Sequence, residues 1–315
     1  SKIMGAIKGR DAIYVWTDTA LFLMRFVGAP FTFSFEQVGT NCGLFGKNAA
    51  VEVDGSSYWM SENGFFTYDG QLKSMPCLVE DYVYDSVNDT SRDLINCGLN
   101  NLFGEINWFY CSEGSDVVDR VVTYNYLDSS AKQPIWTTGS LDRTAWQDSS
   151  VFNRPHATYY TPSDSDSFDV TGNTDGITIY YNQETGTDQV NAGGVVTAIQ
   201  ANILSGDFDI TQKRSNTGQA VGTPDLRGDG EYIMRISRFI PDFINQTGAT
   251  QVSFTTRMYP NSSPVTSNFS ITNSTTFKST RVRARSIALK IANTSSGQDW
   301  KLGTFRLDIS PGGLR

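Results

Sequence analysis

The sequence predicts an all-β protein built from β-propeller-like antiparallel blades, and three observations support this fold class. First, Ala49–Gly70 has the pattern of a complete three-stranded antiparallel meander. Second, weaker copies of this unit occur on both sides of it, and each copy carries a tryptophan. Third, Trp16, Trp59 and Trp108 lie 43 and 49 residues apart, a loose period typical of propeller blades. The alternative is a plain antiparallel sandwich or meander in which this spacing is accidental.

The central unit contains three short strands joined by tight turns. Val51–Val53 alternates apolar and polar residues, which is the period of a half-buried strand. Asp54-Gly55 then suits the positive φ angles of a hairpin turn. Ser57–Met60 forms the returning strand, and after a second turn Phe65–Tyr68 forms the third. Turns this short leave no room for a helix.

The neighbouring copies are hairpins. The upstream copy joins Ala12–Trp16 to Ala20–Phe26, and the downstream copy joins Ile106–Cys111 to Val117–Tyr126. Between the upstream copy and the central unit, Phe31–Phe35 has a phenylalanine at every second position. This alternation predicts a short strand with one aromatic face.

The middle of the chain is less regular. Asp89–Cys97 is the best helix candidate, with Asp89 or Thr90 as its capping residue. The other apolar runs predict short strands at Arg143–Val151, His156–Tyr160, Ile177–Tyr181, Val195–Ile203 and Phe208–Ile210.

From Gly228 onward the alternation becomes clear. Four strands are predicted, at Glu231–Ile240, Gln251–Pro260, Thr280–Ile291 and Thr304–Ile309. We expect them to form an antiparallel sheet that closes the propeller or makes a small extra domain. The expected domains are therefore blades over residues 1–225, with a loop-rich part at 161–225, and a C-terminal antiparallel β-region at 226–315. Because the chain opens with Ser-Lys-Ile-Met and enters a strand pattern almost at once, we also expect it to be a portion of a longer polypeptide.

Composition and charge restrict the possible functions. The 315 residues are 39% hydrophobic and 12% aromatic, which is enough to form a large folded core. No apolar run approaches the length of a membrane span. The formal net charge is −8, so the overall field of the protein does not favour binding to a phosphate backbone.

No catalytic motif is evident, and we expect a protein that is not an enzyme and needs no cofactor. His156 is the one histidine in the chain, no GxSxG surrounds it, and a packed strand histidine is the favoured interpretation. Asp164, Asp166 and Asp169 could bind Ca²⁺, but a solvated acidic loop is favoured. We therefore assign no catalytic, cofactor-binding or metal-binding residues. Four cysteines indicate buried free thiols, with a disulfide as the alternative: Cys42, Cys77, Cys97 and Cys111.

Arg281, Arg283 and Arg285 form the one local basic row. Alternation places them on one face of the predicted strand. Cross-strand pairing with carboxylates such as Glu231 or Asp308 is the favoured interpretation. The alternative is contact with DNA or with an acidic partner subunit.

Two parts of the chain resemble a known family. One is Val15–Gly70, VWTDTALFLMRFVGAPFTFSFEQVGTNCGLFGKNAAVEVDGSSYWMSENGFFTYDG. The other is a series of C-terminal runs: RISRFIPDF (Arg235–Phe243), TTRMYP (Thr255–Pro260), TRVRARSIALKI (Thr280–Ile291) and DWKLGTFRLDISPGG (Asp299–Gly313). Together they resemble structural tail proteins of tailed bacteriophages, especially β-propeller nozzle or tail-tube proteins of short-tailed phages. The middle of the chain adds little to this resemblance.

The resemblance implies a ring of six identical subunits below the capsid connector. Such a ring retains the packaged genome and conducts it during ejection. It implies contacts with tail adaptor or connector proteins, with tail fibres and, at ejection, with the host cell envelope. The genomic DNA would pass through the channel without specific binding, which suits an acidic lining because negative charge repels phosphate. The implied location is the virion tail, after assembly in the host bacterial cytoplasm. The resemblance carries over no catalytic residues.

A second hypothesis belongs to a different class, a host-recognition or carbohydrate-processing protein at the tail periphery. Tyr58, Trp59 and Trp108 could stack on sugar rings, and Asp164 or Asp169 could supply polar contacts. Packing in the core is the favoured role for these aromatic side chains.

Overall fold

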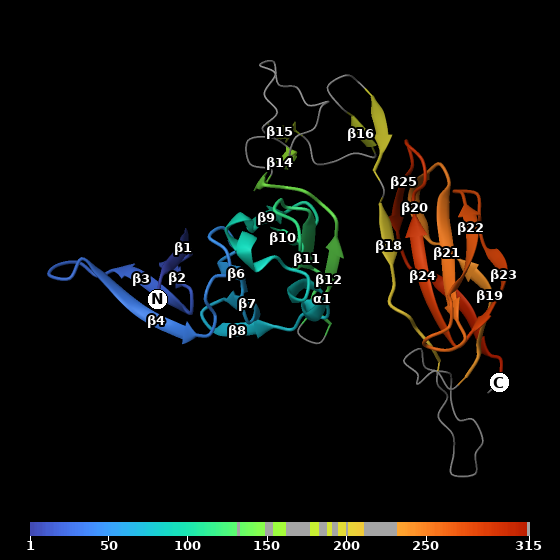
Figure 1. The fold of residues 1–315 in the computed structure, drawn as a ribbon, viewed down its shortest axis with the longest axis horizontal. Helices are drawn as coiled ribbons and strands as arrows, with labels where there is room; N and C mark the ends of the chain where they lie inside the picture. The colour runs from blue at the N-terminus through green and yellow to red at the C-terminus, as the bar shows by residue number, and fades with distance from the viewer. Residues whose placement is uncertain are drawn as a thin grey trace, which may run out of the picture. The chain divides into compact units, whose positions relative to one another are not determined.

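The computed structural model describes residues 1–130, 133–148, 154–161, 177–182, 188–190, 195–199, 201–210 and 232–313. The chain divides into two compact units, Ser1–Thr185 and Gly186–Arg315 (Figure 1). This division differs from the boundary that the sequence suggests near residue 225. The difference arises because β18 (Asn202–Leu204) pairs with β24 (Ser286–Ala292) and so belongs to the C-terminal unit.

The predicted all-β class is confirmed. The described residues form 26 strands and two short helices, and every strand pairing between them is antiparallel. Neither helix has the length and apolar character needed to cross a membrane.

The N-terminal unit begins with three successive four-stranded meanders. The first contains β1 (Ile3–Lys8), β2 (Ile13–Thr17), β3 (Ala20–Phe26) and β4 (Phe33–Thr40). The second contains β5 (Ala50–Val53), β6 (Ser56–Ser61), β7 (Gly64–Tyr68) and β8 (Leu72–Met75). The third contains β9 (Asn96–Asn100), β10 (Glu105–Tyr110), β11 (Arg120–Asn125) and β12 (Trp136–Gly139). A three-stranded sheet follows, made of β13 (Ala145–Gln147), β14 (His156–Thr161) and β15 (Ile177–Asn182).

The three meanders are arranged like consecutive blades. The first strand of each sheet contacts the first strand of the next, since β1 contacts β5 and β5 contacts β9. Between the second and third sheets, the Cys97 backbone N–H donates to the Asn48 carbonyl at 2.8 Å. Inner strands that lie beside one another in this way are typical of propeller blades.

The tryptophan period follows from this repeat. Trp16 lies on β2, Trp59 on β6 and Trp108 on β10, which is the second strand of each sheet. All three side chains are fully buried. The period in the sequence therefore marks the same structural position in each blade-like sheet.

The structure agrees with the sequence-based prediction at the Asp54-Gly55 turn and differs from it at the two helices. Asp54 and Gly55 have φ values of 50° and 87°, so the predicted hairpin turn is confirmed. The expected helix at Asp89–Cys97 is a 3₁₀ segment, Asp89–Leu94, and its cap is Asn88, whose side chain accepts from the Thr90 N–H at 3.0 Å. The sequence did not predict α1 (Glu80–Tyr84), because a single helical turn has too few residues to show a period.

The C-terminal unit contains two main sheets and two small ones. The larger sheet has the order β18-β24-β21-β22, with β21 at Thr250–Arg257 and β22 at Val265–Ile271. The second has the order β23-β19-β26, formed by Lys278–Ala284, Met234–Ile240 and Arg306–Pro311. Two two-stranded sheets complete it: β16 (Asp188–Val190) with β17 (Val196–Ala198), and β20 (Phe243–Thr247) with β25 (Asp299–Leu302). Side chains of both main sheets share one core, which includes Ile236, Phe239, Phe254 and Ile291.

This two-sheet arrangement corrects the expected single C-terminal sheet. The long strand expected at Thr280–Ile291 is divided at Arg285, where the chain leaves one sheet and enters the other. The Arg285 N–H donates to the Arg257 carbonyl at 3.2 Å at this corner. Odd-numbered residues are exposed on β23, but Ile287 and Ile291 of β24 are buried, so the predicted common face does not exist.

Candidate functional site

The aromatic residues considered for sugar stacking are mostly core residues. Trp59 and Trp108 are 0% exposed, and Tyr58 is half-buried. The indole N–H of Trp59 donates to the Cys42 carbonyl at 2.8 Å, and that of Trp108 donates to the Ala49 carbonyl at 3.0 Å. Neither indole can stack on a ligand in this fold. The acidic residues considered with them, Asp164 and Asp169, lie outside the described residues, as does Asp166.

The remaining candidate reactive groups are buried or half-buried. His156 begins β14 and is 8% exposed, which agrees with a packed strand histidine. All four cysteines are free thiols. Burial raises the pKa of both Cys77 and Cys111 to about 11, so these thiols are protonated at neutral pH and are poor nucleophiles. Within the described ranges, no three Asp, Glu, His or Cys side chains form a group able to hold a metal ion.

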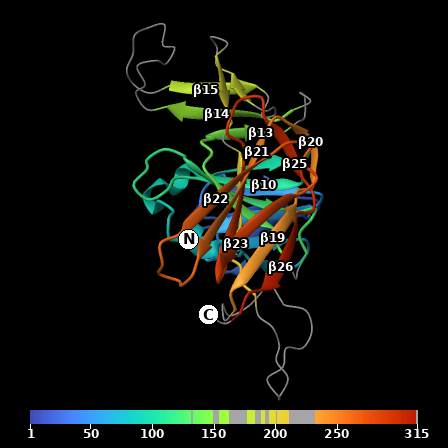
Figure 2. The ribbon, with the colours of Figure 1, turned by 90° about the vertical axis from the view of Figure 1, so that its right-hand side faces the viewer.

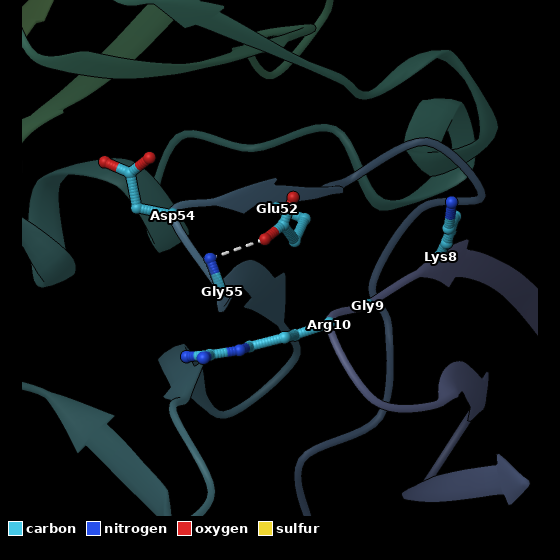
Figure 3. A pocket seen from close by; sticks show the side chains of 6 residues that line it. All are labelled: Lys8, Gly9, Arg10, Glu52, Asp54 and Gly55. Atoms are coloured by element: carbon cyan, nitrogen blue, oxygen red, sulfur yellow. Dashed lines mark hydrogen bonds between the residues drawn. The ribbon is translucent and has the colours of Figure 1, made fainter.

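A hollow of about 460 Å³ lies beside the central hairpin turn (Figure 3). Lys8, Arg10, Glu52 and Asp54 supply two positive and two negative charges. The Glu52 carboxylate is occupied in shaping the turn, because it accepts from the Gly55 N–H at 2.6 Å. Figure 3 shows that Lys8 and the Arg10 guanidinium point to different sides of the hollow. We find no convergent set of catalytic groups here.

A second hollow, in the C-terminal unit, contains an ion pair in its lining. Its charged groups include Asp207 and Arg257, and one Arg257 nitrogen donates to both Asp207 oxygens, at 2.7 and 2.6 Å. The Ser286 hydroxyl donates to the same carboxylate at 2.9 Å. These contacts join β24 and β21 to the segment after β18, so the Asp207 carboxylate has a structural role.

The most conspicuous surface of the N-terminal unit is aromatic. The connection from β3 to β4 extends away from the other strands of its sheet (Figure 1). Five large apolar side chains of this connection and of the strand ends beside it are exposed: Phe26, Val27, Phe31, Phe33 and Phe35, with Phe26 73% and Phe31 76% exposed. We call these residues the aromatic arm. Phe26 and Phe33 lie opposite each other in the strand pairing, with ring centroids 5.9 Å apart.

The aromatic arm extends an apolar sheet face. Met24 lies opposite both Ile13 of β2 and Phe35 of β4 in the strand pairing. The apolar face of the arm therefore continues across β4, β3 and β2. The opposite side is polar near the tip, where Arg25 and Glu36 form an exposed salt bridge at 2.9 Å. The predicted strand with one aromatic face is confirmed for Phe33 and Phe35, whereas Phe31 lies in the bend before β4. Contiguous exposed apolar surface of this kind is typical of contacts between proteins.

The predicted arginine row is divided by the bend at Arg285. Arg281 and Arg283 are exposed on β23, whereas Arg285 lies at the corner between the sheets and lines the second hollow. The expected acidic partner Glu231 lies outside the described residues. Asp308 pairs with a different arginine, since its carboxylate accepts from Arg238 Nε at 2.6 Å.

Comparisons with known proteins leave the family undetermined. A scan against protein-family models finds no match, and a search of the curated proteins finds none either. One solved structure, named "Glycoside hydrolase", is similar to this chain with a TM-score of 0.27 and 11% identity. The similarity covers 94% of this chain and 82% of that chain. A TM-score this low supports no argument about function.

Proposed function

We propose that this chain is a structural protein of a bacteriophage tail, a nozzle or tail-tube subunit that forms a ring around the path of the genome. The observation that carries this proposal is the aromatic arm, an exposed apolar surface of the kind found at contacts between proteins. The family resemblance of Val15–Gly70 supplies the tail context, and this stretch includes the arm. The ring would be a homo-oligomer, with tail adaptor or connector proteins and tail fibres as further partners.

The charge distribution supports passage of DNA without retention. The N-terminal unit contains 11 Lys and Arg against 24 Asp and Glu, a formal net charge of −13. A channel lined by such a unit would repel the phosphate backbone, and DNA could slide through it.

Depletion of the chain from assembling particles tests this proposal. The nozzle account predicts capsids that package DNA and then lose it, because the exit is not closed. The measurement is the DNA content of purified particles, with intact particles as the control. Particles that keep their DNA but fail to adsorb to cells would instead support a host-recognition protein at the tail periphery.

A further inference from the structure

The sheet β23-β19-β26, whose three strands lie side by side in Figure 2, carries a row of arginines on one face. Four arginines are exposed there: Arg235, Arg238, Arg281 and Arg283. We call these residues the arginine face. The alternate residues Ile236 and Val282 are buried, so the two faces of the sheet differ sharply in polarity.

The arginine face contains more positive charge than its own sheet neutralises. Arg235 lies directly opposite Arg283 in the pairing of β19 with β23. Like charges in directly opposite positions destabilise a sheet. Arg283 donates to the Gly312 carbonyl at 3.1 Å, a neutral acceptor. Among the described residues, Asp308 is the one carboxylate that forms a salt bridge with this face, and it pairs with Arg238. The arrangement therefore leaves positive charge available to an external anionic group.

The two units of the chain carry opposite charge. The C-terminal unit contains 14 Lys and Arg against 9 Asp and Glu, a formal net charge of +5, whereas the N-terminal unit carries −13. Complementary potentials of this kind favour contact between the C-terminal unit of one copy and the N-terminal unit of another.

We propose that the arginine face docks onto the acidic N-terminal unit of a second copy of this chain. The inference deepens the proposed ring function and rests on it, because copies of the chain must associate. The two contacting surfaces differ, so the contact is heterologous and can close into a ring. Guanidinium groups suit this contact because they form paired hydrogen bonds with carboxylates. A protein surface is favoured over DNA as the partner. An arginine row that faced the channel would bind phosphates and retain the DNA, whereas the proposed function requires the DNA to slide.

The test reverses two charges on the arginine face. The double variant Arg281→Glu/Arg283→Glu is compared with Lys290→Glu/Lys301→Glu, which makes the same change in net charge at exposed positions outside the face. Self-association of the full chain is measured by sedimentation velocity at low and high salt. We expect the first variant to raise the midpoint concentration of association about tenfold, and the second to change it less than about twofold. We also expect about 0.5 M salt to weaken association of the wild-type chain.

Several outcomes would overturn the inference. One is unchanged association of the arginine variant, and another is a wild-type chain that stays monomeric at low salt. A third is loss of duplex DNA binding in the arginine variant while its association stays normal, which would assign the face to nucleic acid. If the glutamate variant does not fold, Arg281→Gln/Arg283→Gln provides the same comparison with a smaller change. A normal ring in virions that carry the arginine variant would refute the docking contact and leave the nozzle proposal intact.

Discussion

Each blade tryptophan combines a large apolar ring with one polar N–H group. At Trp59 the fold supplies packing partners for the ring and a hydrogen-bond acceptor for the N–H. Its ring lies 5.3 Å from that of Trp16 and 5.9 Å from that of Phe66, measured between centroids. Its N–H reaches the Cys42 carbonyl in the connector before the second sheet. The side chain therefore joins two sheets and the connector between them. Its burial was expected from the sequence, whereas its hydrogen-bond acceptor was not, because Cys42 is 17 residues away.

Replacement of Trp59 by alanine tests its core role. We expect Trp59→Ala to lower the free energy of unfolding by about 3–5 kcal/mol, because it removes a fully buried aromatic side chain. The matched control is Phe31→Ala, which changes an exposed aromatic residue and should alter stability by less than about 0.5 kcal/mol. Urea unfolding followed by fluorescence measures both. A stable Trp59→Ala protein that had lost binding to glycans would contradict this role and support the carbohydrate hypothesis.

The buried thiols predict a loss of stability at alkaline pH. Burial raises the pKa of Cys77 and Cys111 from 9.0 to about 11. Between these values the unfolded chain releases thiol protons that the folded chain retains, so the free energy of unfolding falls as pH rises. The contribution is fully present below pH 9 and is lost by about pH 11. Urea unfolding across this range should show the decline, and Cys77→Ala should make it shallower. An equally steep decline in that variant would assign the effect to other groups, such as Tyr84, whose pKa burial also raises.

At the scale of elements, the sequence predicted the meanders better than the connections between sheets. Alternation and the Asp54-Gly55 turn identify the second sheet because both signals are local. The bend at Arg285 has no comparable local signal, since alternation continues through it. The glycine at position 43 is required by a tertiary contact. A Cβ atom there would lie 2.1 Å from the Asp18 carbonyl oxygen, a contact between distant parts of the chain that no local pattern reveals.

The aromatic arm was predictable as a strand but not as an exposed surface. The double variant Phe33→Thr/Phe35→Thr should keep the fold, because both side chains are exposed and threonine favours strands. We expect its incorporation into phage particles to fall severalfold, measured as the amount of this chain per purified particle. Ser34→Thr, on the other side of the same strand, is the control. Normal incorporation of the double variant would show that the aromatic arm is not a contact surface.

For the whole chain, the sequence patterns predict the fold class correctly. They do not predict the division into two units of opposite charge. The sequence places a boundary near residue 225 because alternation becomes clear only after Gly228. In the structure, the long-range pairing of β18 with β24 assigns residues from Gly186 onward to the C-terminal unit. The charges of −13 and +5 emerge only when this boundary is known.

Imaging of intact virions, with averaging of the tail to subunit detail, would show directly where this chain lies. We expect a sixfold ring of this chain around the DNA channel below the connector. We also expect blade-like sheets in the N-terminal unit of each subunit and contact between the arginine face and the neighbouring acidic unit. A monomer or trimer of this chain at the tail periphery, away from the channel, would contradict the account and make host recognition the better explanation.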